Sequence, residues 1–383
     1  MTTVLSDVNG FPKELLEQPA SERLAYFQRK VVAHPYLKTT HQALARAIQQ
    51  PLGASLILVF GPTGVGKTTL RLRIEQQLVE EARNAKDYAP GNIPVASIEA
   101  ASPETGDFRW KDYYMRTLQA LDDPFLDHRI DYKMKNARRN KDGQLVIGSN
   151  VPICDLRWTV EQALRSRHPK AFIIDEAQHL KKISGGKRLL DQMDILKSLA
   201  NVTDTVHVLI GTYELLSLAN LSGQLNRRSI DIHFPRYRCE NASDWTVFKN
   251  ILLTFQRYLP LAKEPDLVGQ GEYFYERSLG CVGILKDWLT RSLSLALDES
   301  SNTLDKRQLE STAYSHRKLL RIIQETREGE ETLKEQTLHQ SDLRMLLGIH
   351  QPTEEPSNPH KTTKRVGERN PVRDQVGRVE NAA

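Results

Sequence analysis

The sequence predicts an α/β fold, in which a parallel β-sheet is sandwiched by helices. Three observations lead to this prediction: short apolar runs alternate with helical patterns, a glycine-rich loop joins one apolar run to a helix, and a pair of acids ends a later run. Repeated alternation of strand and helix is typical of parallel sheets that are covered on both faces. The predicted strands are residues 56–60, 93–98, 171–175, 206–210 and 230–234.

The glycine-rich loop, residues 61–68, reads Gly-Pro-Thr-Gly-Val-Gly-Lys-Thr and fits the phosphate-binding pattern G-x-x-x-x-G-K-[ST] at every fixed position. Its glycines allow backbone N–H groups to turn toward phosphate oxygens, and the helix start that follows adds partial positive charge. Lys67 is expected to reach the β- and γ-phosphates, and the Thr68 hydroxyl to ligate Mg²⁺. The predicted contacts to the nucleotide are Gly61, Pro62, Thr63, Gly64, Val65, Gly66, Lys67, Thr68 and Thr69.

An acid pair, Asp175 and Glu176, ends the predicted strand 171–175. In P-loop ATPases the first acid of such a pair holds Mg²⁺, and the second can polarise the attacking water. The alternative is an ordinary turn whose acids begin a helix. Two acids rather than one favour an ATP hydrolase over a small-molecule kinase.

Two further features complete a candidate catalytic site. Thr212 follows the predicted strand 206–210 and is expected to lie between the two phosphate-site strands, where it could orient the water; an ordinary strand-end threonine is the alternative. Arg227 and Arg228 precede the predicted strand 230–234. Their position does not suit the ATP site of their own protomer. It suits an arginine finger that reaches the γ-phosphate bound by a neighbouring protomer, and Arg227 is favoured for this role. A solvated basic turn is the alternative.

Composition restricts the class of protein. Hydrophobic residues make up 39% of the 383 residues, and no apolar run approaches the roughly 18 residues that span a bilayer. The first residues lack the basic and apolar regions of a secretory signal. Cys154, Cys239 and Cys281 are far apart without metal-ligand spacing, so a reducing, cytoplasmic location is expected. A net charge of +5 permits nucleic-acid binding without requiring it.

The patterns divide the chain into five predicted segments. They are an N-terminal helical segment (1–50), an α/β nucleotide-binding domain (51–238), a helical lid domain (239–300), C-terminal helices (301–350) and a disordered basic tail (351–383). The tail could dock a partner, aid DNA binding or be passive. Lys286 lies on the first turn of a predicted lid helix and could approach the nucleotide when the lid closes. A surface lysine is the alternative.

The chain resembles the AAA+ superfamily over roughly residues 40–300. The resemblance rests on the order of five features: the loop, the acid pair, the polar strand end, the arginine turn and the helical lid. Three stretches are similar to the TnsC/TniB family of transposition regulators. They are Asp175-Glu176-Ala177-Gln178-His179-Leu180, Ile210-Gly211-Thr212-Tyr213-Glu214-Leu215 and Gly283-Ile284-Leu285-Lys286-Asp287-Trp288-Leu289. The acid motif also occurs in secretion-linked ATPases of the ExeA kind and in phage DNA-transposition ATPases.

The resemblance implies an ATP-dependent regulator that oligomerises on double-stranded DNA, as a ring or a filament. Such a regulator links a target-selection protein of the TnsD/TniQ kind to the transposase, and ATP hydrolysis drives disassembly. The alternative is an ExeA-like or signalling AAA+ ATPase that acts on a protein partner without DNA.

The resemblance also implies site roles. ATP and Mg²⁺ would be the cofactors, with Thr68 and Asp175 serving the metal. Glu176 would serve hydrolysis, and Thr212 would be the first sensor. Either arginine of the arginine turn would be the finger acting on a neighbouring protomer. The second sensor of AAA+ proteins is commonly arginine, so Lys286 departs from the pattern.

Two basic stretches give independent support for DNA binding. Residues 128–141 carry Lys and Arg with Asp131 as their one acid, and a second basic loop follows the acid motif. Such side chains neutralise phosphates without reading sequence. A solvated charged face is the alternative. The candidate DNA contacts are Lys133, Lys135, Arg138, Arg139, Lys181, Lys182, Lys187 and Arg188.

Overall fold

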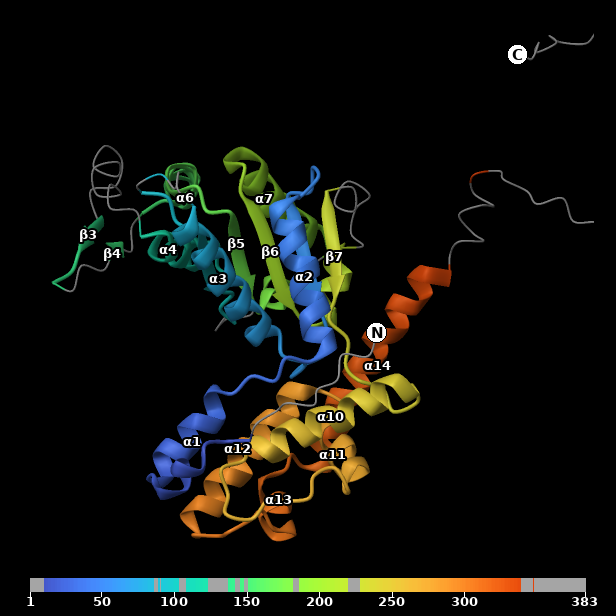
Figure 1. The fold of residues 1–383 in the computed structure, drawn as a ribbon. Helices are drawn as coiled ribbons and strands as arrows, with labels where there is room; N and C mark the ends of the chain where they lie inside the picture. Colours follow the sequence, from blue (N-terminus) through green and yellow to red (C-terminus); the bar gives the residue numbers. More distant parts are fainter. Residues whose placement is uncertain are drawn as a thin grey trace, which may run out of the picture. The chain divides into compact units, whose positions relative to one another are not determined.

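The fold is that of a computed structural model, which describes residues 10–85, 89, 91–102, 108–122, 137–141, 145–147, 151–181, 186–219, 228–338 and 347. Its main sheet is parallel and has the strand order β2-β5-β6-β1-β7 (Figure 1). The strands are β1 (Leu56–Phe60), β2 (Val95–Glu99), β5 (Ala171–Asp175), β6 (Val206–Gly211) and β7 (Ser229–His233). The predicted parallel sheet is confirmed, and each predicted strand lies within about two residues of its predicted limits.

The strand order brings the predicted site together. β6 lies between β1 and β5, as expected for the strand that leads to Thr212. Parallel strands end at the same edge, so the phosphate loop, the acid pair and Thr212 share that edge. A separate antiparallel pair, β3 (Ala137–Arg139) and β4 (Leu145–Ile147), was not predicted, because strands of this length carry little periodicity.

Helices cover both faces of the sheet (Figure 1). They are α2 (Pro35–Gln49), α3 (Lys67–Asn84), α4 (Trp110–Leu121), α6 (Ile153–Arg167) and α7 (Gly186–Thr203). Leu58 and Phe172 pack with α4, α6 and α7 on one face, whereas Val59 and Ile173 pack with α2 and α3 on the other. β1 and β5 are buried at every position, which is the pattern of central parallel strands.

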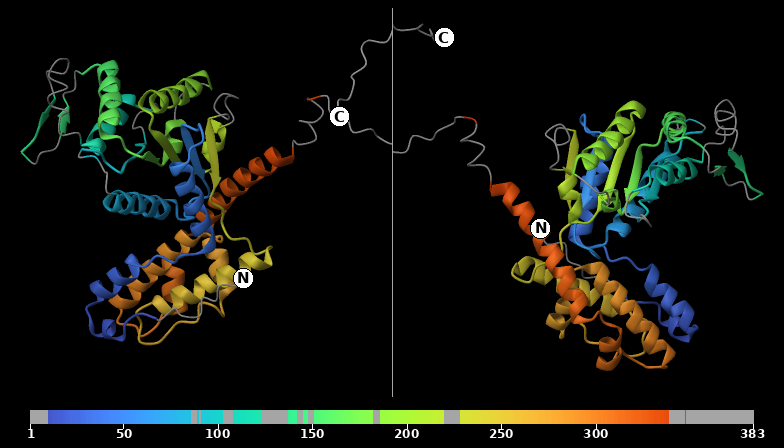
Figure 2. Two further views of the ribbon diagram at one scale, coloured as in Figure 1. Left: turned by 45° about the horizontal axis from the view of Figure 1, so that its top comes forward. Right: turned by 180° about the vertical axis from the view of Figure 1, so that it is seen from behind.

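A second core joins helices of the predicted lid domain to one helix on either side of it. These helices, called the lid helices below, are α1 (Ala20–Arg29), α10 (Ala242–Tyr258), α11 (Gly271–Ser278), α12 (Val282–Asp298) and α13 (Lys306–Thr312). Phe27 of α1, Phe255 of α10 and Trp288 of α12 are almost fully buried there. Figure 2 shows α1, in blue, beside the orange helices of this core. The N-terminal helical segment therefore contributes α1 to the lid core and α2 to the sheet.

The remaining elements precede α1, follow β5 or β6, or come after α13. They are η1 (Lys13–Glu17), η2 (Ala177–Lys181), η3 (Tyr213–Leu215), α8 (Leu216–Ala219) and α14 (His316–Leu338). Residues up to Leu333 form one compact unit that contains both cores. The predicted tail, 351–383, falls outside the described residues. In the described part of the chain, no helix combines the length and the apolarity needed to cross a membrane.

Two buried histidines are expected to make the fold sensitive to acid. Nδ1 of His34 lies 2.9 Å from the Tyr237 hydroxyl, and His207 is fully buried in β6. Burial lowers the pKa of each histidine to about 4, from an ordinary value of 6.5, and the charge of Arg73 adds to the effect on His34. Both imidazoles are therefore neutral in the folded chain at neutral pH.

We expect the free energy of unfolding to fall as the pH falls from about 6.5 to about 4. In this window the unfolded chain binds protons on both histidines that the folded chain does not bind. Each histidine contributes up to about 1.4 kcal/mol per pH unit. Urea unfolding near pH ~7 and pH ~5 measures the decline. It should be smaller in His207→Leu, and an equal decline in variant and wild type would contradict the role of His207.

Candidate nucleotide-binding site

The phosphate loop connects β1 to α3 and depends on its glycines. Gly64 and Gly66 have φ angles of +75° and +115°, in the left-handed region that residues with a Cβ rarely adopt. At Gly61 the constraint is space, since a Cβ atom would lie 2.2 Å from the carbonyl oxygen of Phe234. α3 begins at Lys67, directly after Gly66, so its unpaired N–H groups border the loop. This backbone suits a phosphate group.

The Lys67 side chain is buried inside the loop. Its Nζ donates to the carbonyl oxygens of Gly61 and Pro62 at 3.1 and 2.9 Å, and the residue is 8% exposed. Burial lowers its pKa to about 8, while the charges of Glu176 and Asp175 act in the opposite direction. The ammonium group therefore lies in the loop and within electrostatic reach of the acid pair.

Asp175, the last residue of β5, is held by two donors. Nε of Arg71 donates to its Oδ2 at 3.0 Å, and the backbone N–H of Glu176 donates to its Oδ1 at 2.9 Å. Arg71 lies one turn of α3 beyond Lys67 and also pairs with Glu75 at 2.7 Å. Arg71 was not among the predicted site residues. In the sequence, the i,i+4 spacing of Arg71 and Glu75 indicates only an ion pair on a helix surface. The contact with Asp175 arises because the strand order places α3 beside the end of β5.

Glu176 leaves β5 in a left-handed conformation, with a φ of +52°. Such a conformation costs roughly 1–3 kcal/mol outside glycine. The Glu176 carboxylate accepts a hydrogen bond from the Gln178 side chain, which was also not predicted as a site residue. Thr212 follows β6, and among the described residues its buried hydroxyl has no hydrogen-bond partner.

Two cavities border the loop. One, of about 500 Å³, is lined by Thr63 of the loop, by Thr212 and by Thr326 of α14. The other, of about 350 Å³, lies beside Gly66 and is lined by apolar side chains such as Val65 and Val282 and by polar ones such as Asp287. Small-molecule sites combine apolar surface with a few polar groups, and this cavity offers both next to the phosphate loop.

The lid helix α12 begins against the phosphate loop. The backbone N–H of Ile284 donates to the carbonyl oxygen of Gly64 at 3.1 Å. A Cβ atom at Gly283 would lie 2.4 Å from the same oxygen, so this close approach requires glycine. The loop is therefore in direct contact with the lid.

Lys286 lines the second cavity, but its ammonium group is engaged elsewhere. Nζ donates to the carbonyl oxygens of Phe27 and Lys30 and lies 4.1 Å from the centroid of the Phe27 ring. Burial lowers the Lys286 pKa to about 8. Lys286 thus joins the lid to α1, and the predicted nucleotide contact would require the ammonium group to leave these carbonyl groups.

Arg228 lies at the sheet edge opposite the phosphate loop. It is exposed, and its carbonyl oxygen accepts from the backbone N–H groups of Ser55 and Leu56, where β1 begins. Arg228 therefore lies away from the candidate nucleotide site of its own protomer. Arg227 falls outside the described residues.

The candidate DNA contacts are described only in part. Lys133, Lys135 and Lys182 fall outside the described residues. Arg138 and Arg139 belong to β3, and Lys187 and Arg188 belong to α7, all described by their backbone alone. Lys181 ends η2, and its side chain lines the 500 Å³ cavity with Thr63 and Thr212. Lys181 therefore lies beside the candidate nucleotide site.

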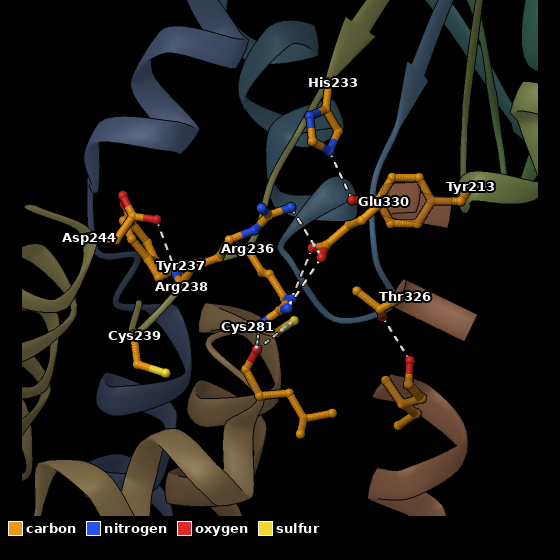
Figure 3. Close-up of polar contacts among 12 residues, drawn as sticks. Tyr213, His233, Arg236, Tyr237, Arg238, Cys239, Asp244, Cys281, Thr326 and Glu330 are labelled. Atoms are coloured by element: carbon orange, nitrogen blue, oxygen red, sulfur yellow. Dashed lines mark hydrogen bonds and ion pairs between the residues drawn. The ribbon is translucent and has the colours of Figure 1, made fainter. Parts of the chain in front are cut away.

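A buried ion-pair cluster joins the helix α14 to the segment that follows β7 (Figure 3). Glu330 accepts from Nε and Nη2 of Arg236 at 3.0 and 3.2 Å, and its carboxylate lies 3.1 Å from Nη2 of Arg238. The side chains of Arg236 and Glu330 are only 9% and 8% exposed. A Cβ atom at Gly329 would lie 2.2 Å from Cγ of Tyr213, the residue after Thr212. α14 therefore packs directly beside the predicted sensor.

Residues 49–219 match the family model described as an AAA domain. The match contains β1, the phosphate loop, the acid pair and β6, so the AAA+ type of P-loop fold expected for this part is confirmed. No curated protein matches the chain.

Three solved structures resemble the chain at low identity. The ORC2 protein of Aeropyrum pernix is 15% identical, with a TM-score of 0.47 over 75% of this chain and 70% of that chain. The Walker-type ATPase of Pyrococcus abyssi is 15% identical, with a TM-score of 0.41 over 82% and 85%. Domain III of the replication initiation protein DnaA of Thermotoga maritima is 14% identical, with a TM-score of 0.42 over 75% and 94%.

We expect Glu330→Gln to lower the free energy of unfolding by roughly 3–5 kcal/mol, because it leaves the buried Arg236 guanidinium without its counter-ion. The matched control is Glu325→Gln on the same helix, whose pair with Arg321 has side chains that are 84% and 59% exposed. That control should lose less than about 1 kcal/mol. Urea unfolding measures both values. Equal, small losses would contradict a structural role for the cluster.

Proposed function

We propose that this chain is an ATPase that regulates DNA transposition, and that it oligomerises on double-stranded DNA in its ATP-bound form. It would link a target-selection protein of the TnsD/TniQ kind to the transposase, with ATP hydrolysis driving disassembly. The observation that carries the ATPase part is the convergence of Lys67, the acid pair and Thr212 at one sheet edge, next to two cavities.

The residues around the phosphate loop are suited to binding ATP together with Mg²⁺. Thr68 is exposed at the start of α3, and Asp175 offers carboxylate oxygens at the end of β5. These two residues would hold the metal, which supplies positive charge against the triphosphate oxygens. The left-handed glycines and the buried Lys67 ammonium group provide the cradle for the phosphates.

Hydrolysis transfers the terminal phosphoryl group to water. The water oxygen bonds to the γ-phosphorus, and the bond from that phosphorus to the bridging oxygen breaks. In our proposal Glu176 orients the water and takes its proton. Lys67 balances the charge of the phosphates, and the unpartnered Thr212 hydroxyl donates to the γ-phosphate or to the water. ADP and inorganic phosphate are the products.

The nucleotide would also hold protomers together. Arg228 is exposed at the edge opposite its own loop, where it suits contact with a neighbouring molecule. Arg227 or Arg228 would reach the γ-phosphate of that neighbour, so ATP would join the subunits and its hydrolysis would weaken the contact.

Support for DNA and for transposition comes from the sequence. The stretches around the acid pair, Thr212 and Lys286 are similar to TnsC/TniB regulators, and the basic stretches suit phosphate contacts that do not read sequence. A cytoplasmic location belongs to the same proposal. The alternative, an ATPase that acts on a protein without DNA, shares the nucleotide site and differs in its partner.

We expect duplex DNA binding to require ATP. In a gel shift at low salt the wild-type chain should bind duplex DNA with ATP, and rising salt should weaken binding because the contacts are to phosphates. Lys67→Ala should lose the ATP-dependent shift, since it loses a phosphate contact. Glu176→Gln should keep a longer-lived complex, since hydrolysis is blocked.

The same assay distinguishes the alternatives. If ATP caused no shift at low salt while the protein still released phosphate, the ATPase acting on a protein partner would be favoured. If the Glu176→Gln complex dissociated in ATP at the wild-type rate, hydrolysis by Glu176 would not drive disassembly. Unfolding curves of both variants serve as the control for intact folding.

A further inference from the structure

The Gln178 side chain joins two strands at the edge where the phosphate loop lies. Gln178 belongs to η2, directly after the acid pair, and is 8% exposed. Its Nε2 donates to Oε2 of Glu176, and its Oε1 accepts from the backbone N–H of Thr212 at 3.2 Å. One buried amide therefore contacts both the acid after β5 and the predicted sensor after β6.

The chemistry of the two partners fixes the orientation of this amide. An ionised carboxylate only accepts hydrogen bonds, so the amide nitrogen must face Glu176. A backbone N–H only donates, so the amide oxygen must face Thr212. Glutamate at position 178 would keep the acceptor, lose the donor and place a second negative charge beside Glu176. Leucine would lose both hydrogen bonds at a similar volume.

Gly211 provides the space for the amide. A Cβ atom at Gly211 would lie 2.5 Å from Oε1 of Gln178, which is closer than real Cβ contacts. Gly211 has no positive φ, so glycine is needed here for space and not for backbone conformation. The end of β6 is therefore shaped around the Gln178 side chain.

Glu176 needs such a contact more than Asp175 does. Asp175 is still in the strand and is held by Arg71 and by a backbone N–H. Glu176 has left the strand in a left-handed conformation, so the geometry of β5 no longer orients its carboxylate. A hydrogen bond to a charged group is short and directional, and it restricts the carboxylate.

We propose that Gln178 is a positioning residue for ATP hydrolysis. Its amide holds the Glu176 carboxylate in the orientation that activates water and ties it to the end of β6. This inference rests on the ATPase activity proposed above and adds the residue that orients Glu176. The phosphates are bound by the loop, so turnover depends on Gln178 and nucleotide binding does not.

Steady-state phosphate release by the full chain tests the role of Gln178. Gln178→Leu should lower kcat about 10- to 100-fold, the usual effect of losing a residue that orients a catalytic group. Gln178→Glu should lower kcat at least as much. The KM for ATP should change by less than about two-fold in both variants. An unchanged or raised kcat, or a loss confined to KM, would overturn the proposal.

A double-variant cycle separates positioning from general damage. Gly211→Ala should lower kcat in the wild-type background, because its methyl group displaces the amide of Gln178. In Gln178→Ala the 2.5 Å contact is gone, and only the flexible tip of Leu215, 3.0 Å from the new Cβ atom, has to shift, so adding Gly211→Ala should change kcat by less than about two-fold. Additive losses in the double variant would overturn the proposal. Gln49→Leu, which removes an exposed amide that donates to Glu81, is the matched control and should keep wild-type turnover.

Two kinds of failure are distinguishable. If the wild-type chain released no phosphate from ATP with Mg²⁺, with or without duplex DNA, the ATPase function and the role of Gln178 would both be overturned. If the wild-type chain turned over and Gln178→Leu matched it, only the role of Gln178 would be overturned.

Discussion

The rest of the nucleotide site depends on the buried ammonium group of Lys67. Burying a charge costs several kcal/mol unless hydrogen bonds and opposite charges compensate. Here the compensation comes from the carbonyl oxygens of Gly61 and Pro62 and from the charges of Glu176 and Asp175. These groups come from the ends of two strands, so the charge can be stabilised only if β1 and β5 end at the same edge of the sheet. The parallel order with β6 between them meets this requirement.

Segments that are remote in sequence converge around this charge. The lid contacts the loop through Ile284, and Lys286 ties the lid to α1. Glu330 of α14 pairs with Arg236, and the neighbouring Gly329 packs on Tyr213, the residue after Thr212. A change at the phosphate loop therefore has direct packing contacts through which it can reach the lid, and a change at Tyr213 can reach α14. In a switch protein such contacts couple the nucleotide to the position of other segments.

Short sequence motifs were enough to predict part of the site. The residue spacing predicted the phosphate loop and the acid pair. The strand–helix alternation predicted that Thr212 lies between the strand before the loop and the strand before the acid pair. Arg71, Gln178 and Glu330 could not be predicted in the same way, because their partners are defined by the sheet order and by packing between distant helices. Lys286 illustrates the same limit. The sequence predicted Lys286 on the first turn of a lid helix, whereas α12 begins at Val282 and places it one turn further on. The direction of its side chain depends on the carbonyl oxygens at the end of α1.

The central claim is that each ATP site is completed by a neighbouring protomer. The most direct test is the rate of phosphate release per protomer, measured over a wide range of protein concentration with and without duplex DNA. The proposal predicts that this rate rises with concentration until oligomers saturate, and that duplex DNA moves the rise to lower concentration. A rate per protomer that is independent of both protein concentration and DNA would contradict it.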